Sequence, residues 1–266
     1  MELECPICGE QLKLQDKRYS CANNHSFDLA RQGYVNLLVV QNKHSLNPGD
    51  TREQVLSRRE FLEADFYAPI VRTLIDTAKE LGIQGQILDV GCGEGYYSAR
   101  LADALESPLL GLDISKEAVR CAAAKYKGKQ WLCATAAHIP VGAESVSLLT
   151  SLFAITLPGE FARVLRKDGW YFQVLAAQDH LLGLKSVIYD QLNLKEKDTV
   201  PQLPGFELVK SVPIRFTFTV EGRQIRNLFS MTPHVFRVGK EGVRRLEQTQ
   251  TLTDTASCVL NVYRRS

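Results

Sequence analysis

Four side chains near the amino terminus have the types and the spacing of a metal site. Cys5 and Cys8 are separated by two residues, Cys21 follows after twelve more, and His25 after a further three. Two thiolates at the first spacing fit on one tight turn, and the second pair completes a tetrahedron, the usual geometry of structural zinc. Four protein ligands leave no open position, so we expect a Zn²⁺ ion that folds this segment and takes no part in catalysis. The alternative is four unligated side chains that happen to lie close together.

A glycine-rich loop follows the apolar run at residues 86–90. Residues 87–95 read Ile-Leu-Asp-Val-Gly-Cys-Gly-Glu-Gly, and a helix is expected to begin near Tyr96. Glycines allow a tight turn and let a ligand approach the backbone N–H groups at the helix start. A dinucleotide loop would place its third glycine one residue later. A carboxylate just before the loop suits a cationic ligand, such as S-adenosylmethionine, better than a phosphate. The residues expected at the cofactor here are Asp89, Gly91, Gly93, Glu94 and Gly95.

Two further loops at the same edge of the predicted sheet are expected to complete this site. The next apolar run ends in Leu112-Asp113-Ile114, and a carboxylate at that point can accept both hydrogen bonds of a ribose diol. A third run is followed by residues 135–140, which include His138 and are placed to hold the adenine. A glycine-rich turn alone is often only a tight turn, but its combination with two carboxylates in strand, turn and helix order favours cofactor binding. Cys92 is interpreted as a small packed residue and not as a nucleophile.

The elements that would position these loops alternate between strands and helices, which is typical of parallel βαβ units. A capping box at Thr51 and an N-cap at Ser115 open two of the helices, and Gly82 is expected to end a third. The last two apolar runs alternate with polar residues and predict an antiparallel pair on an otherwise parallel sheet. The predicted fold class is α/β, Rossmann-like, with strands at residues 86–90, 109–113, 130–134, 146–152, 170–176, 206–218 and 257–264.

The chain divides into three predicted segments. Residues 1–34 carry the metal ligands and have too few apolar positions for a core of their own, residues 35–50 are interpreted as a linker, and residues 51–266 form the cofactor-binding domain. The chain has seven cysteines, an odd number of which three have metal-ligand spacing, so reduced thiols and metal ligands are favoured over a disulfide framework. With no apolar run of membrane-spanning length, this predicts a soluble, cytoplasmic protein with no membrane partner. The net charge is +2, but residues 207–266 carry 10 Lys/Arg against 5 Asp/Glu. Such a surplus suits phosphates, and is also common on an ordinary solvated face.

Short segments along nearly the whole chain match one family. The segments are the Cys5–His25 module with Phe27-Asp28, residues 33–38, Pro48-Gly49-Asp50, Arg58-Arg59-x-Phe61-Leu62, Tyr67-x-Pro69, the loop at residues 88–97, His180-Leu181, Leu184-Lys185, Ile188-Tyr189 and Met231-Thr232-Pro233. Together they resemble the bacterial 23S rRNA (guanine-N1)-methyltransferases, which act in the hairpin 35 region of the large-subunit RNA.

The resemblance implies a zinc ribbon joined to a class I methyltransferase domain, with S-adenosylmethionine as methyl donor, 23S rRNA as partner and a homodimer. It also implies that Tyr67, Gly95, Tyr96 and His180 lie around the cofactor. Two segments depart from the family pattern. Phe153-Ala154-Ile155 stands where the family tends to have Tyr followed by Ala-Pro or Ser-Pro, and Lys167-Asp168-Gly169 stands where Lys-Pro-Gly is usual. The first departure falls where a target base is expected.

Methyl transfer to guanine N1 requires removal of the N1 proton and a base swung out of its stack. His138 and His180 are candidates for this acid–base role on side-chain chemistry alone. Phe153 is a candidate platform for the flipped base, with a core position as the alternative. Two other functions stay open: a small-molecule methyltransferase with a structural zinc module, and a non-catalytic RNA-binding module. Candidate phosphate contacts are Arg58, Arg59, Arg163, Arg166 and Lys167, with an ordinary solvated surface as the alternative for each of them.

Overall fold

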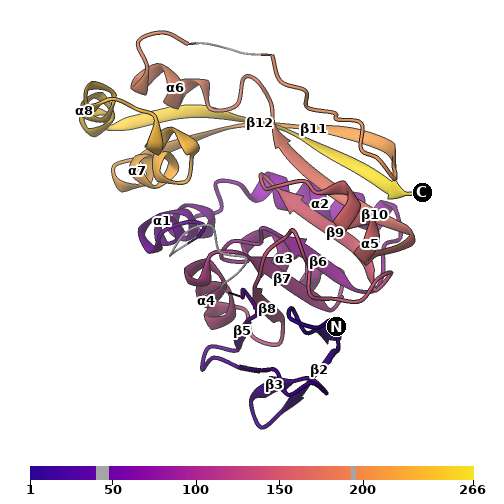
Figure 1. The fold of residues 1–266 in the computed structure, drawn as a ribbon. Coiled ribbons are helices and arrows are strands. Elements are labelled where there is room, and N and C mark those ends of the chain that lie inside the picture. Colours follow the sequence, from indigo (N-terminus) through magenta and orange to yellow (C-terminus); the bar gives the residue numbers. More distant parts are fainter. Residues whose placement is uncertain (40–47, 193–195) are drawn as a thin grey trace.

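The fold is built on one eight-stranded sheet with the strand order β11-β12-β10-β9-β6-β7-β8-β5 (Figure 1). The structure is a computed structural model, and it describes residues 1–39, 48–192 and 196–266. Half of the predicted linker, residues 40–47, therefore lies outside the described residues. Within the described ranges, no helix combines the length and the apolar character that crossing a bilayer requires.

Six strands form the parallel part of this sheet, and each pairs with its neighbour in parallel. Their residues are almost all buried, as expected where helices or other segments cover both faces. The five strands predicted between residues 86 and 176 are confirmed, although the last begins at Leu165 and not at Trp170. The six strands are β5 (Tyr34–Asn36), β6 (Ile87–Val90), β7 (Leu109–Asp113), β8 (Gln130–Cys133), β9 (Val146–Leu152) and β10 (Leu165–Ala176).

The predicted helix starts are confirmed at their caps. Thr51 accepts a hydrogen bond from the Gln54 backbone at 3.3 Å, while the Gln54 side chain accepts from the Thr51 backbone at 3.0 Å. Ser115 caps the helix that follows it, and Gly82 follows the end of α2 with φ +60°. The helices are α1 (Arg52–Glu63), α2 (Ala68–Glu80), α3 (Tyr96–Ala104), α4 (Lys116–Lys125), α5 (Pro158–Val164), α6 (Leu182–Ile188), α7 (Arg223–Ser230) and α8 (Lys240–Gln248), with a 3-10 turn η2 (Pro233–Phe236).

Two antiparallel strands extend the sheet and support a second group of helices. β11 (Phe206–Glu221) pairs with β12 (Thr251–Arg265), and β12 pairs with β10. The predicted antiparallel pair is therefore confirmed and is longer than expected. Figure 1 shows this long pair crossing the molecule with α6, α7 and α8 beside it, and α7 lying near α1. An ion pair between Arg223 and Glu60 joins α7 to α1 at 2.7 Å.

The amino-terminal module is a small antiparallel sheet of β1 (Leu3–Glu4), β2 (Gln11–Gln15), β3 (Arg18–Ser20) and β4 (Ser26–Asp28). The chain then enters the main sheet directly, because β5 pairs in parallel with β8. The predicted linker thus begins with residues of a strand, and the boundary placed at residue 34 falls inside β5. A three-residue strand shows no periodicity in the sequence, so its pairing with a segment about 100 residues away could not be read from the pattern.

Candidate active site and metal centre

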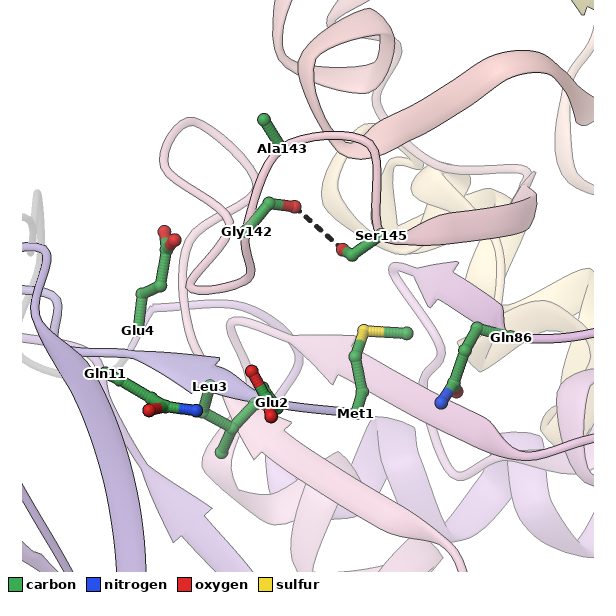
Figure 2. A pocket seen from close by; sticks show the side chains of 9 residues that line it. All are labelled: Met1, Glu2, Leu3, Glu4, Gln11, Gln86, Gly142, Ala143 and Ser145. Atoms are coloured by element: carbon green, nitrogen blue, oxygen red, sulfur yellow. Dashed lines mark hydrogen bonds between the residues drawn. The ribbon is translucent and has the colours of Figure 1, made fainter.

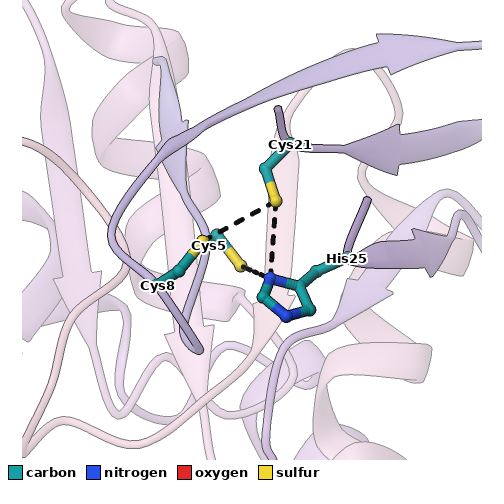
Figure 3. Close-up of side chains that lie close together, drawn as sticks. All are labelled: Cys5, Cys8, Cys21 and His25. Atoms are coloured by element: carbon teal, nitrogen blue, oxygen red, sulfur yellow. Dashed lines mark hydrogen bonds between the residues drawn. The ribbon is translucent and has the colours of Figure 1, made fainter. Parts of the chain in front are cut away.

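The four predicted metal ligands converge in the amino-terminal module (Figure 3). Their donor atoms all lie within 4.8 Å of one another. The Nδ1 atom of His25 is 3.5 Å from the Sγ atoms of both Cys5 and Cys21, and Cys8 Sγ is 3.7 Å from Cys21 Sγ. A tetrahedral zinc ion separates two sulfur ligands by about 3.8 Å and a sulfur from a nitrogen ligand by about 3.5 Å. The three cysteines and the histidine therefore fit the edges of a zinc tetrahedron.

Two tight turns present these ligands. The Gly9 backbone donates to the Cys5 carbonyl at 2.8 Å, and the Asn24 backbone donates to the Cys21 carbonyl at 3.1 Å. Gly9 and Asn24 both have left-handed backbone conformations, with φ of +77° and +61°, which glycine and asparagine adopt at low cost. Each turn thus brings one pair of ligands together before the module closes around the ion.

The glycine loop joins β6 to α3 at the carboxyl end of the sheet, as predicted. Backbone N–H groups of Gly91 and Cys92 both donate to the Leu112 carbonyl, which fixes the loop against β7. A side chain on Gly95, at φ +83°, would put its Cβ 2.5 Å from Trp131. A side chain on Gly91 would put its Cβ 2.6 Å from that of Ala154. The loop is therefore packed from both sides, and only glycine fits at these two positions.

Three carboxyl groups lie around this loop: Asp89 and Glu94 are buried, and Asp113 is half-buried. Asp113 accepts from the Gly93 backbone at 2.9 Å and from the Ser115 backbone at 2.8 Å, and Asp89 accepts from the Thr150 hydroxyl at 2.6 Å. Burial raises the pKa of Asp89 to about 6 and that of Glu94 to about 7.

The Oε2 atom of Glu94 has no hydrogen-bond partner within the described ranges. An unsatisfied, buried carboxylate oxygen is costly, and a cationic ligand would satisfy it. This donor set fits the ammonium and sulfonium groups of S-adenosylmethionine.

Arg58 is the cation that faces these carboxylates. Its Nη2 lies 2.5 Å from Asp50 Oδ2, and a Cβ on Gly93 would lie 3.8 Å from its Nη1. The attraction of Asp50 and Glu94 outweighs burial and raises the pKa of Arg58. Arg58 was one of the candidate phosphate contacts, and the structure places it beside the cofactor loop. No sequence pattern indicates its pairing with Asp50, because the pairing depends on how the segment before α1 folds back.

That segment covers the turn after β7. The Ser115 hydroxyl donates to the Asp50 carbonyl at 2.8 Å. Gly49 has φ +84°, and a Cβ there would lie 2.9 Å from the Ser115 Cβ and 3.0 Å from Ile114. Residues 49–50 therefore cover Ile114 and Ser115, directly after Asp113.

Two aromatic residues implied by the resemblance lie on different sides of the loop. The Tyr96 hydroxyl donates to Asp65 at 2.8 Å and the Arg100 guanidinium stacks 3.8 Å from its ring centroid, so the Tyr96 side chain is already engaged. What remains for a ligand is its backbone N–H at the start of α3. Tyr67 is buried, and its ring centroid lies 6.3 Å from that of His180. Tyr67 thus links the start of α2 to the segment before α6.

Phe153 and His180 lie together at the carboxyl end of β9. Their ring centroids are 6.1 Å apart and their planes are tilted by 34°. Phe153 has φ +54° and a side chain that is 41% exposed. A left-handed conformation is costly for a bulky residue and is most often kept at functional sites. Since Ala154 packs on Gly91, Phe153 stands directly beside the cofactor loop.

His180 is neutral near pH 7. Burial and repulsion by Lys185 lower its pKa to about 4. Its Nδ1 atom lies 3.1 Å from the Ser257 carbonyl oxygen and 3.2 Å from the Ser257 backbone nitrogen, so these contacts fit a ring proton on either nitrogen. The prediction of an acid–base role for His180 therefore stays a prediction.

The remaining sequence-predicted residues are separate from this aromatic pair. His138 is exposed in the turn after β8, whereas Phe153 follows β9, on the other side of β6. Arg163 is held by Glu160 at 2.8 Å and by two backbone carbonyls, and Arg59 pairs with Glu63. Asp168 has φ +60°, which the ring of proline forbids, so the second departure from the family pattern reflects a local turn.

A cavity of about 460 Å³ lies at the opposite end of the strands (Figure 2). Gln86 precedes β6 and Ser145 precedes β9, so the cavity opens at the amino ends of the strands. None of the sequence-predicted site residues lines it. Its residues are Met1, Glu2, Leu3, Glu4, Gln11, Gln86, Gly142, Ala143 and Ser145.

Comparison with known proteins agrees with both parts of this site. A zinc-ribbon family model described as "RlmA, N-terminal" matches residues 3–46, and a "Methyltransferase domain" model matches residues 87–169. The protein has the class I methyltransferase fold, a zinc ribbon, and S-adenosylmethionine and zinc as its cofactors. A solved structure from Anaeromyxobacter dehalogenans, provisionally named a Type II methyltransferase, has 17% identity and a TM-score of 0.51, covering 73% of this chain and 94% of that one, and supports the fold alone.

Two curated relatives are similar over most of their length. The 23S rRNA (guanine(748)-N(1))-methyltransferase of Streptomyces fradiae is 33% identical over 87% of this chain and 84% of its own. A protein of Micromonospora griseorubida, provisionally named a 23S rRNA (guanine-N(1)-)-methyltransferase, is 34% identical over 74% of this chain and 71% of its own. At this identity and coverage, the chain belongs to the family of 23S rRNA (guanine-N1)-methyltransferases.

Proposed function

We propose that this protein transfers the methyl group of S-adenosylmethionine to N1 of a guanine in the hairpin 35 region of 23S rRNA. The observation that carries the proposal is the exposed ring of Phe153, held in a left-handed conformation beside the cofactor loop. An aromatic face at that place suits a planar base, which stacks on it when swung out of the RNA. Membership of the family supports this choice of substrate.

The residues of the loop would hold the methyl donor by charge and by backbone contacts. Glu94 has the free oxygen for the ammonium group, and Arg58 is the cation for the methionine carboxylate. Asp113 keeps lone pairs for the ribose diol, since each of its oxygens accepts a single backbone hydrogen bond in this structure. The remaining proposed contacts are Tyr67, Asp89, Gly91, Gly93, Gly95, Tyr96, Ile114, His138 and His180.

The base pocket would use Phe153 and His180 in different roles. S-adenosylmethionine, when bound, supplies an electrophilic methyl group. Guanine N1 becomes nucleophilic as its proton leaves to solvent, and the negative charge then spreads to O6. A donated hydrogen bond stabilises such a charge, and the neutral His180 ring supplies one when its proton is on Nε2. We therefore assign His180 to stabilising the deprotonated base and Phe153 to stacking it.

The test is methyl transfer from labelled S-adenosylmethionine to a hairpin 35 transcript, with the position mapped by the reverse-transcription stop that N1-methylguanine causes. Wild-type protein is expected to give one stop at a guanine, and Asp113→Ala to give none. Asp16→Ala, which alters an exposed turn of the zinc module, is the control. Cofactor binding without transfer to RNA would contradict the proposal, and transfer to a small metabolite would favour the alternative enzyme class.

The proposed substrate indicates the cellular compartment of the protein. An enzyme of 23S rRNA acts in the cytoplasm, where ribosomes are assembled. The homodimer implied by the resemblance stays a prediction, which sedimentation of the purified protein would check.

A further inference from the structure

A surface beside the base pocket combines positive charge with an exposed aromatic ring. We call it the α6–η2 surface. It consists of Lys185 on α6, Lys197, His234 and Phe236 of η2, and Arg237 just after η2. The base pocket lies next to it, because α6 begins two residues after His180 and the Lys185 ammonium donates to the Gln178 carbonyl at 3.4 Å.

The surface is held in place by contacts between its elements. The Tyr189 hydroxyl, at the end of α6, lies 3.0 Å from His234 Nδ1, and the two rings meet edge to face at 5.5 Å. Arg245 of α8 donates to the Val187 carbonyl at 2.7 Å. A Cβ on Gly242 would lie 2.2 Å from the Ile188 carbonyl oxygen, so α8 packs directly on α6. The charged groups are therefore presented by a fixed framework.

The cations of this surface repel one another. Burial and repulsion by Lys197 lower the pKa of Lys185, and burial followed by repulsion from Lys185 and Arg237 lowers the pKa of His234. In the part of the chain that the structure describes, Lys185, Lys197 and Arg237 form no ion pair, whereas the nearby Arg245 pairs with Asp190 at 2.9 Å. Asp179 and Asp254 attract Lys185 electrostatically without forming an ion pair with it. Cations left without an ion-pair partner favour binding of an anion.

Phe236 adds a feature that a simple phosphate site would not need. Its side chain is 76% exposed, the largest value among the exposed large hydrophobic residues of the described ranges. Lone exposed apolar residues are common, but Phe236 directly precedes Arg237 and shares η2 with His234, which contacts α6. An exposed aromatic ring beside cations is the pattern of single-stranded RNA sites, where bases stack and phosphates are neutralised. The combination indicates RNA rather than an isolated phosphate.

We propose that the α6–η2 surface binds the RNA strand that flanks the target guanine, with a phosphate among Lys185, Lys197 and Arg237 and a base stacked on Phe236. This inference rests on the proposed function, since it names how the same substrate is held. It assigns affinity for RNA to this surface and leaves the chemistry to the base pocket.

The test is equilibrium binding of a hairpin 35 transcript at a series of KCl concentrations. The double variant Lys197→Ala/Arg237→Ala should reduce the slope of log K against log[KCl] by about 1.4, since each phosphate contact to a single strand contributes about 0.7. Phe236→Ala should weaken binding roughly 5- to 150-fold, and Phe236→Tyr should restore it. For methyl transfer, KM for RNA should rise while kcat at saturating RNA stays unchanged.

Two control variants remove comparable exposed side chains elsewhere. Lys79→Ala in α2 and Val209→Ala in β11 should leave both the affinity and the salt slope unchanged. Calorimetric binding of S-adenosylmethionine, expected to be normal in every variant, checks folding. Wild-type affinity and slope in the double variant and in Phe236→Ala would overturn this inference while the proposed function stood. Failure of the wild-type protein to bind or methylate the transcript would overturn both.

Discussion

Binding of S-adenosylmethionine is expected to release a proton from Glu94. Burial raises the pKa of this carboxyl from 4.5 to about 7, so about half of the Glu94 side chains are protonated at pH 7 in the free protein. An ammonium group placed against its unpartnered Oε2 favours the carboxylate form and lowers the pKa again. The proton then leaves as the ligand enters.

The amount released follows from this pKa. If binding returns the pKa to about 4.5, about 0.5 proton leaves per ligand at pH 7, about 0.9 at pH 6 and about 0.1 at pH 8. Asp89, whose pKa is about 6, adds at most about 0.1 proton at pH 7. The coupling between deprotonation of Glu94 and binding is about 3 kcal/mol.

The assay is calorimetric titration in buffers of different ionisation enthalpy, where the dependence of the observed enthalpy on the buffer counts protons. Glu94→Gln should lower the number of protons released per bound ligand by about 0.5 at pH 7. It should also weaken binding roughly 10- to 150-fold, the range for loss of a hydrogen bond between charged groups. Glu247→Gln, an exposed change on α8, is the matched control. Equal enthalpies in all buffers at pH 6 and pH 7 for the wild-type protein would refute the reasoning.

The raised pKa of Glu94 also predicts how the stability of the free protein changes with pH. Because the pKa of Glu94 is higher in the folded than in the unfolded protein, Glu94 contributes to the free energy of unfolding below pH 4.5. This contribution is lost as the pH rises through about 7. The free wild-type protein should therefore lose up to about 3 kcal/mol relative to Glu94→Gln between about pH 5 and pH 8. Denaturant unfolding at several pH values measures this difference, and a constant difference would contradict it.

Three further changes test other parts of the site. Gly95→Ala should cost about 2–4 kcal/mol and abolish cofactor binding because its Cβ meets Trp131, whereas Gly128→Ala, with φ +77° and open space, should cost about 1–2 kcal/mol in denaturant unfolding and bind normally. Cys21→Ser should remove zinc, measured by mass spectrometry of the metal, and lower the Tm; retained zinc would contradict the ligand set. Phe153→Gly should keep stability within about 1 kcal/mol, since it relieves the left-handed strain, yet lower kcat/KM for RNA roughly 5- to 150-fold, and unchanged kcat/KM would rule out stacking.

The strands around the cofactor could be predicted because each is a buried apolar run bounded by polar or glycine residues. β7 and β9 match the predicted bounds at both ends, and the caps at Thr51 and Ser115 follow from local hydrogen bonds between residues three apart. Such features depend on neighbours in the sequence. β5 was missed because three residues give no period, and only its pairing with β8 defines it.

Part of the candidate site could also be predicted from the sequence. Asp89 and Asp113 are identified by their place at the ends of strands, and the four zinc ligands by spacing. The pairing of Arg58 with Asp50 was not, because it depends on how residues 48–50 fold over the turn at Ser115. The approach of Phe153 to His180 was also hidden, since it joins the ends of β9 and β10 through side-chain packing alone.

The zinc module shares a core with the methyltransferase sheet, which changes how its role can be tested. Leu3, Cys5 and Leu12 belong to the same buried cluster as Val90 and Leu112, and these two residues directly precede the glycine loop and Asp113. The Glu4 backbone also donates to the Pro140 carbonyl at 2.9 Å. Deletion of residues 1–34 would therefore expose the core beneath the cofactor site and would abolish activity whether or not the module binds RNA.

Exposed side chains of the module give the cleaner test. Ile7 lies between two ligands on the first turn and is 56% exposed, so Ile7→Ser leaves the core and the ligand set in place. If the module contacts RNA through this turn, the variant should bind S-adenosylmethionine normally and lose affinity for the transcript. If the module only supports the sheet, both affinities should stay at wild-type values. Because the ligands hold the turn and Cys5 of that turn belongs to the same buried cluster as Val90, loss of zinc should weaken cofactor binding in either case.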